Sequence, residues 1–372
     1  MSRTLKTAAV LAALSLTVAG CANKSDEGGS GGGCNKVIAY AGAMSGPNAQ
    51  LGINEYNGGQ LAVNQYNEKH SDCKVQFKKF DTEGDQNKAP GVVTQLVNDQ
   101  NIIGVLGLPF SGESKATGKI FEQAGLVHIT ASATNPSLTT NGWKTFFRGL
   151  GNDNVQGPAV KALADKQGFK KVFVVQDDSD YGVGLAATAT KALGGMVTGS
   201  DKVTTNQKDF SATVQKVLDS KADAVFYSGY YAEGAPFDSQ LVAKGYKGAF
   251  IGPDGVKDPE FIKQAGSAST NAYFTCPCIP GDTLKDFATA YKTVANSAPG
   301  TYSVEAYDAT NVLLDGVSKG NTSRSKLLSY VKGADFKGLA KQYKWNDKGE
   351  LTDAAVYGYK VDNGQIVSIG KL

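Results

Sequence analysis

The chain has 372 residues, with 38 basic and 35 acidic side chains and a formal net charge of +3. Leaving out Arg3 and Lys6, 36 basic residues stand against 35 acidic ones, so the body of the protein is close to neutral. This balance, without a basic tract or an aromatic-basic stripe, excludes a nucleic-acid-binding surface. The body is long enough to form two domains with substantial cores.

Residues 1–20 have the pattern of a signal peptide. Arg3 and Lys6 give it a positive start, and residues 8–19 form an apolar run that is too short to span a bilayer as a stable helix. No later apolar run is long enough to cross a membrane. We therefore expect residues 1–20 to be removed on export.

The end of this segment, residues 16–21 (Leu-Thr-Val-Ala-Gly-Cys), resembles the lipobox of bacterial lipoproteins. The resemblance implies cleavage before Cys21 and lipidation of its thiol, with palmitate among the acyl chains. The alternative is an ordinary signal peptide with an incidental cysteine. Residues 21–34 are rich in Gly and polar residues and should form a flexible tether. Together these features predict an extracytoplasmic protein, lipid-anchored to the outer face of the bacterial cytoplasmic membrane.

Four further cysteines remain, an even number that suggests two disulfides in an oxidising compartment. Cys34 and Cys73 each precede a predicted strand. If those strands are parallel neighbours, both cysteines lie at one edge of the sheet, and we predict a Cys34–Cys73 disulfide. Cys276 and Cys278 are separated only by a proline. They are interpreted as a strained disulfide, a free pair or a soft-metal site.

Beyond the tether, apolar strands alternate with helices. The predicted strands are residues 37–40, 75–80, 102–108, 126–130, 171–176, 224–227 and 249–251. The predicted helices are residues 56–68, 90–98, 114–123, 184–193, 210–218 and 235–244. The pattern breaks near residues 149–151 and then restarts. Apolar strands separated by helices indicate buried parallel sheets, so the sequence predicts an α/β fold with two doubly wound parallel-sheet lobes.

Small and polar loops follow the predicted strands, at residues 43–47, 108–112, 132–136, 177–182 and 252–255. In open α/β sheets, ligands bind beyond the carboxyl ends of the strands, where loops lead into helix N-termini. Free N–H groups and hydroxyls at such places bind carboxylates. An acidic residue at a strand end of the other lobe would bind an ammonium, so the two lobes together would hold a zwitterion.

At these loops the sequence resembles the leucine/isoleucine/valine-binding proteins of bacterial ABC importers, which have the type I periplasmic binding protein fold. The matching segments occur in the family's order between residues 36 and 366, at residues 43–47, 129–136, 181–184, 229–230, 252–255 and 345–349. The resemblance implies two lobes joined by a hinge of three crossings. Lobe one would comprise residues 35–151 and 277–348, and lobe two residues 152–276 and 349–372.

The resemblance also implies where each end of an amino acid would bind. Ser111, Ser132, Ala133 and Thr134 would bind the α-carboxylate through main-chain N–H groups and hydroxyls. Asp254 would pair with the α-ammonium, at a position where the branched-chain binder has Glu.

Three aromatic residues complete the implied site. Tyr181 and Tyr230 would close over the ligand from the second lobe, and Tyr302 falls where the family packs a Phe against the ligand's side chain. Glu305 is the next acid considered for the ammonium. The expected ligand is a branched-chain or another neutral amino acid.

Other polar residues receive structural interpretations. The Asp177–Asp180 segment lacks the Gly and the distal Glu of a calcium loop, so it is interpreted as a solvated strand end, as are Asp81, Glu83 and Asp85. His128 lies in an apolar strand and is interpreted as a core residue with its hydrogen bonds satisfied. Without a second His near a nucleophile, a Ser-His-Asp enzyme has no support. No metal and no cofactor are expected.

The sequence thus predicts a solute-binding protein that delivers an amino acid to the permease subunits of an ABC importer, and not an enzyme. We expect a monomer that meets the membrane through its lipid anchor only and binds no nucleic acid. One alternative is a receptor domain that senses amino acids or small amides. The other is a hydrolase such as an amidase or esterase, which turnover of amides or esters would reveal.

Overall fold

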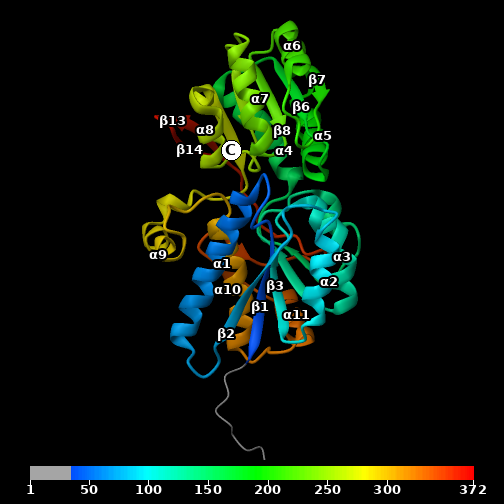
Figure 1. Ribbon diagram of the computed structural model, residues 1–372, viewed down its shortest axis with the longest axis vertical. Helices are drawn as coiled ribbons and strands as arrows, with labels where there is room; N and C mark the ends of the chain where they lie inside the picture. Colours follow the sequence, from blue (N-terminus) through cyan, green and yellow to red (C-terminus); the bar gives the residue numbers. More distant parts are fainter. Residues whose placement is uncertain (1–34) are drawn as a thin grey trace, which may run out of the picture. The chain divides into compact units, whose positions relative to one another are not determined.

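The computed structural model describes residues 35–372 and is built around two open β-sheets (Figure 1). The predicted signal peptide, Cys21, the tether and Cys34 lie outside the described residues. Within residues 35–372, every helix is either too short or too polar to span a bilayer.

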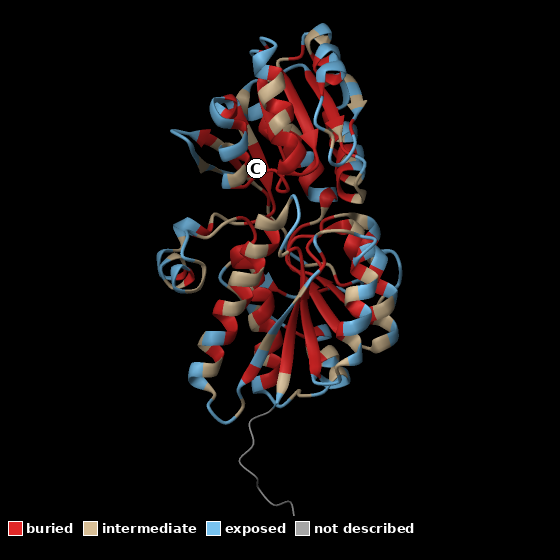
Figure 2. Ribbon diagram, in the orientation of Figure 1, coloured by how far each residue is buried: buried red, intermediate tan, exposed pale blue. Residues whose placement is uncertain are grey.

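The first sheet has five strands in the order β2-β1-β3-β4-β5, all parallel. Its strands are β1 (Lys36–Gly42), β2 (Val75–Asp81), β3 (Ile102–Gly107), β4 (Val127–Thr130) and β5 (Phe146–Arg148). Helices α1 (Ala49–Lys69), α10 (Ser303–Ser318) and α11 (Arg324–Lys332) cover one face, and α2 (Ala89–Asn98) and α3 (Ser111–Ala124) cover the other. Two faces covered by helices explain why the inner strands read as unbroken apolar runs (Figure 2).

The second sheet has seven strands in the order β14-β13-β10-β9-β8-β6-β7. Its strands are β6 (Val172–Gln176), β7 (Val197–Lys202), β8 (Ala224–Ser228), β9 (Ala249–Gly252), β10 (Ala272–Cys276), β13 (Tyr357–Asp362) and β14 (Gln365–Lys371). The helices that accompany it are α4 (Asp153–Gln167), α5 (Asp180–Leu193), α6 (Ser211–Ser220), α7 (Tyr231–Ala243) and α8 (Pro259–Ala265). Strand β13 is antiparallel to both of its neighbours, while the other pairs are parallel.

The doubly wound α/β architecture predicted from the alternation of strands and helices is confirmed. Several details differ from expectation. Strands β5, β7 and β10 and helices α4, α8, α10 and α11 lie outside the ranges predicted from the sequence. The β13–β14 hairpin was not predicted. The edge strand β2 is half-exposed, because no strand covers its outer side and Lys78 and Lys79 face solvent. Helix α1 begins at Ala49 rather than Tyr56, although the glycines within it disfavour a helix. Gly58 and Gly59 are explained by packing, because a Cβ at Gly58 would strike the Ser303 carbonyl of α10.

The chain passes between the two sheets three times. It leaves the first sheet between β5 and α4, and it returns after β10 to form α9 (Lys285–Ala295), α10 and α11. The short pair β11 (Phe336–Lys337) and β12 (Gln342–Tyr343) follows, and then the chain crosses again to β13. As a result, helices from the last third of the chain complete the core of the first sheet.

Candidate functional site

Loops at the carboxyl ends of the two sheets meet and form direct bonds. The main-chain N–H of Gln50, in α1, donates to the Tyr231 hydroxyl at the start of α7, at 3.2 Å. Lys115 of α3 forms an ion pair with Asp180 at the start of α5, at 2.6 Å. The place where open α/β sheets bind ligands therefore lies between the two lobes here.

Asp254 lies just after β9 and is fully buried at this junction. Its carboxylate accepts hydrogen bonds from the Tyr181 hydroxyl, from Gln156 Nε2 at 2.8 Å and from the Tyr302 hydroxyl at 2.8 Å. Burial raises the pKa of Asp254, although these three donors act in the opposite direction. A carboxylate has roughly four lone-pair sites, so one further donor can be accepted. Tyr302 precedes α10, and its bond to Asp254 therefore joins the two lobes.

The predicted carboxylate loop is only partly available to a ligand. The main-chain N–H groups of Ser132 and Ala133 both donate to the Thr130 hydroxyl, at 3.3 and 2.9 Å. The Ser132 hydroxyl donates to the Pro109 carbonyl at 2.7 Å. In this arrangement Ser132 and Ala133 shape the loop through internal hydrogen bonds.

Ser111 and Thr134 have free bonding capacity. Ser111 is the first residue of α3, which no side chain caps, and the first N–H groups of a helix have no partner within it. The Thr134 hydroxyl is buried and makes no hydrogen bond of standard geometry within the described residues. Beside it lies the buried carboxyl of Asp153, whose pKa burial raises to about 8, while the Thr134 hydroxyl opposes the shift. The N-terminus of α3 and the Thr134 hydroxyl thus lie at the junction with the lobe that carries Asp254.

A buried arginine, which the sequence reasoning missed, holds this loop in place. Arg148 ends β5, and its guanidinium donates to both carboxylate oxygens of Glu350 at 2.9 Å. It also donates to the Ala133 carbonyl and, at 3.1 Å, to that of Asn135. Burial opposes ionisation of Glu350, but the charge and hydrogen bonds of Arg148 outweigh it and lower the pKa of Glu350. The only sequence signal was a cation ending an apolar strand, Phe-Phe-Arg.

A cavity of about 440 Å³ opens between the lobes beside this cluster. Of the eight predicted ligand contacts, only Tyr230 lines it. Tyr230 packs edge-on against Phe110, with ring centroids 4.8 Å apart, and lies 5.1 Å from the ring of Tyr181. The aromatic pair Phe110–Tyr230 therefore lies at the wall of the cavity, and Tyr230 contacts Tyr181, whose hydroxyl bonds to Asp254. The lining residues are Gly46, Pro47, Asn48, Glu83, Gly84, Asp85, Gln86, Asn87, Phe110, Gly112, Glu113, Asp178, Ser179, Asp180, Thr205, Asn206, Tyr230 and Glu233.

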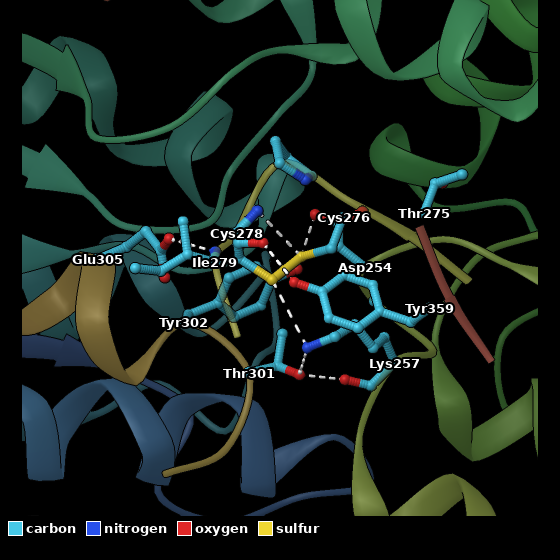
Figure 3. Close-up of a disulfide and its surroundings, with 12 residues drawn as sticks. Asp254, Lys257, Thr275, Cys276, Cys278, Ile279, Thr301, Tyr302, Glu305 and Tyr359 are labelled. Atoms are coloured by element: carbon cyan, nitrogen blue, oxygen red, sulfur yellow. Dashed lines mark hydrogen bonds between the residues drawn. A yellow bond between two sulfur atoms is a disulfide. The ribbon is translucent and has the colours of Figure 1, made fainter. Parts of the chain in front are cut away.

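The second crossing carries a disulfide between Cys276 and Cys278, which decides among the three interpretations of this pair (Figure 3). The buried ammonium of Lys257 lies 3.7 Å from Cys278 Sγ and 4.3 Å from the ring centroid of Tyr359. Burial lowers the pKa of Lys257. Glu305 lies nearby but accepts a hydrogen bond from a main-chain N–H of this crossing and pairs with a lysine. These contacts all use one carboxylate oxygen of Glu305, and the other makes no hydrogen bond of standard geometry within residues 35–372.

Cys73 takes part in a disulfide. Strands β1 and β2 are parallel neighbours, with Lys36 opposite Val75, as the reasoning for Cys73 required. The predicted partner, Cys34, lies outside the described residues, so the pairing stays a prediction.

Two structural interpretations are wrong in part. Asp177 is not solvated: it is buried, accepts hydrogen bonds from Ser179, and burial raises its pKa to about 7. His128 does lie in the core, stacked on Phe121 at 4.0 Å, but neither ring nitrogen makes a hydrogen bond of standard geometry within the described residues. Burial lowers the pKa of His128 to about 3, so the ring is neutral. Among residues 35–372, no group of three or more His, Cys, Asp or Glu side chains is placed to hold a metal ion.

Comparison with known proteins agrees with this architecture. Residues 37–365 match the family described as periplasmic binding protein. The Leu/Ile/Val/Thr-binding protein of Salmonella typhimurium is 32% identical over 324 residues, which span 84% of this chain and 88% of that protein. The Leu/Ile/Val-binding protein of Escherichia coli is 31% identical, over 84% of this chain and 87% of its own length. Among solved structures, this chain superposes with a TM-score of 0.84 on the branched-chain amino acid transporter substrate binding protein LivJ of Streptococcus pneumoniae, in complex with isoleucine. The two are 26% identical, and the match covers 91% of this chain and 99% of that one.

Proposed function

Because this chain belongs to the periplasmic binding protein family, we propose that it binds an α-amino acid between its lobes and delivers it to the permease of an ABC importer. One observation supports this most directly. A buried carboxylate, Asp254, follows strand β9 of one lobe, opposite the uncapped N-terminus of α3 and the Thr134 hydroxyl of the other. A negative group facing helix N–H donors is complementary to a zwitterion.

In this proposal the α-carboxylate binds the N–H groups at Ser111 and the Thr134 hydroxyl, and the α-ammonium donates to Asp254. Tyr181 and Tyr302, which already bond to Asp254, set its orientation. A ligand that touches both lobes stabilises their closed arrangement, and the permease distinguishes closed from open protein. The family is one of solute-binding proteins, and we propose binding without turnover.

The test is isothermal calorimetry of Asp254→Asn with L-leucine and with its deaminated analogue 4-methylpentanoate. A charge-assisted contact contributes roughly 1.5–3 kcal/mol, so the variant should bind leucine about tenfold to a hundredfold more weakly. It should also lose the wild-type preference for leucine over the analogue. Asp238→Asn, a buried acid of α7 in the same lobe, is the matched control and should bind as wild type does. Unchanged binding by Asp254→Asn would overturn the ammonium assignment.

The membrane anchor is a separate part of the proposal. The lipobox resemblance supports lipidation of Cys21, which lies outside the described residues. In cells grown with labelled palmitate, the wild type should carry the label and Cys21→Ser should not. The Cys21→Ser variant should also be lost from the membrane fraction. Equal labelling of both proteins would contradict the lipoprotein assignment.

A further inference from the structure

The interlobe cavity is strongly acidic. Both lobes contribute carboxylates to its lining, and no Lys or Arg is among the lining residues. The acidic residues are Glu83, Asp85 and Glu113 from lobe one, with Asp178, Asp180 and Glu233 from lobe two. A chain whose body is close to neutral overall therefore collects negative charge at one concave surface.

Two of these carboxylates are buried and incompletely bonded. Glu113 is 1% exposed, and neither of its carboxylate oxygens makes a hydrogen bond of standard geometry within the described residues. Glu233 is 2% exposed; Oε1 accepts from the Asn206 N–H at 2.6 Å and Oε2 has no such partner. Burial raises the pKa of Glu113 to about 7, although the nearby Thr82 hydroxyl opposes the shift, and it also raises the pKa of Glu233. Burying a carboxylate without a partner is costly, and the unused acceptor oxygens of Glu113 and Glu233 can each accept a hydrogen bond from a cationic donor that enters the cavity.

Lysines outside the cavity compensate only part of this charge. Lys88 pairs with Glu83 at 2.5 Å, and the partly exposed Lys115 pairs with Asp180 at 2.6 Å. The charge of Lys208 also acts on Glu233 and opposes the rise of its pKa, without an ion pair between them. The remaining four acids form no ion pair within the part of the chain that the structure describes. These are Asp85, Glu113, Asp178 and Glu233.

The shape of the cavity favours an organic cation over a metal ion. Its carboxylates are spread around about 440 Å³, and no three of the described acids, His or Cys converge closely enough to hold a metal. An alkyl ammonium or a guanidinium carries several N–H donors and an apolar stem. The rings of Phe110 and Tyr230, which line the cavity, offer faces for that stem and for the cation itself.

We propose that the cavity binds the cationic end of the ligand, so that the protein takes α-amino acids with a basic side chain. This inference rests on the proposed function and names the ligand class for the same site. Phe110 precedes Ser111 in the chain, and Glu113 follows two residues later, so the carboxylate site and the acidic cavity share the N-terminus of α3. A zwitterion held at Asp254 would pass its side chain along the Phe110–Tyr230 pair into the cavity.

The test is calorimetry with pairs of ligands that differ in charge but little in shape: L-arginine with L-citrulline, and L-lysine with L-norleucine. The wild type should bind each cation at least tenfold more tightly than its neutral partner. Glu113→Gln and Glu233→Gln should each reduce that ratio about fivefold or more, and the double variant should abolish it. Asp219→Asn, an exposed acid of α6, is the control and should keep the wild-type ratio.

The outcomes separate this inference from the proposed function. Neutral ligands binding as tightly as the cations to the wild type would overturn the inference even if the glutamate variants fail to fold, and so would an unchanged ratio in the double variant. Leucine binding that requires Asp254, without preference for cations, would overturn the inference and keep the proposed function. Agmatine is the decarboxylated analogue of arginine. Agmatine binding as tightly as arginine would keep the cation site and overturn the amino-acid function.

Discussion

Glu350→Gln should destabilise the protein strongly, because it removes the counter-charge of a buried arginine. The Arg148 side chain is 0% exposed and that of Glu350 is 15% exposed, so solvent screens the pair very little. Two parallel hydrogen bonds at 2.9 Å join them. Removing one partner of a buried pair costs about 3–5 kcal/mol, mainly by leaving the other charge uncompensated. Glutamine keeps one acceptor oxygen, so we expect a loss of about 3 kcal/mol in the free energy of unfolding.

Urea unfolding of the mature protein at pH 7 measures this loss, and a double-mutant cycle isolates the pair. The cycle compares Arg148→Met and Glu350→Leu with the double variant that carries both changes and so removes both charges. The double variant should lose at least about 2 kcal/mol less in the free energy of unfolding than the sum of these two single variants. It should nevertheless bind ligand more weakly, because Arg148 also holds the Ala133 and Asn135 carbonyls of the carboxylate loop.

The pH dependence of the free energy of unfolding provides a second test of the Arg148–Glu350 pair. The pKa of Glu350 is lowered in the folded protein, so its stabilising contribution is present above its ordinary pKa and is lost as the pH falls through the folded value. The difference between wild type and Glu350→Gln should therefore shrink on strong acidification. Additive single variants, or a Glu350→Gln protein as stable as wild type at pH 7, would refute the reasoning.

Three further predictions concern His128, Lys257 and the pairing of Cys73. Burial lowers the pKa of His128 to about 3 in the folded protein, so on acidification the unfolded chain binds a proton first and the folded state loses stability. Urea unfolding should show that His128→Phe loses about 2 kcal/mol less stability than wild type between pH 7 and pH 5. The same dependence of stability on pH in both proteins would contradict this. Lys257 is buried, and among the described residues no carboxylate lies within ion-pair distance of its ammonium. Lys257→Met should therefore leave the melting temperature unchanged or raise it. A large decrease would show that the ammonium stabilises the hinge. Non-reducing peptide mapping should recover Cys34 linked to Cys73, whereas recovery of Cys34 as a free thiol would contradict the pairing.

The sequence predicted most of the central strands because buried parallel strands are unbroken apolar runs, a local signal. It did not predict the β13–β14 hairpin, whose pairing depends on a chain segment returning to β10 from the far end of the sequence. Asp254 was placed correctly at the end of a strand for the same local reason. Its bond to Tyr302 was not foreseen, because it joins different lobes and appears only once the chain has folded.

The difference between local patterns and contacts distant in sequence also explains why the roles of Arg148 and Glu113 were not predicted. Arg148 could be seen as an unusual cation, but its partner is 202 residues away in sequence. Glu113 reads as an ordinary acid in the first turn of a helix, where the helix dipole favours it. Its burial depends on groups far from it in sequence, such as Thr82, and no local pattern reports it.

The arrangement of charges around the cavity also affects how the two lobes approach each other. Three of its carboxylates belong to one lobe and three to the other, so bringing the lobes together over an empty cleft requires work against like-charge repulsion. Part of that work is relieved by Lys88 and Lys115, and mobile ions relieve more of it as the Debye length shortens with added salt. A cation that enters the cleft reverses the sign of the force, because each lobe is then attracted to the same charge. In the proposed complex, the charge of the solute would therefore help to hold the lobes together, in addition to its fit.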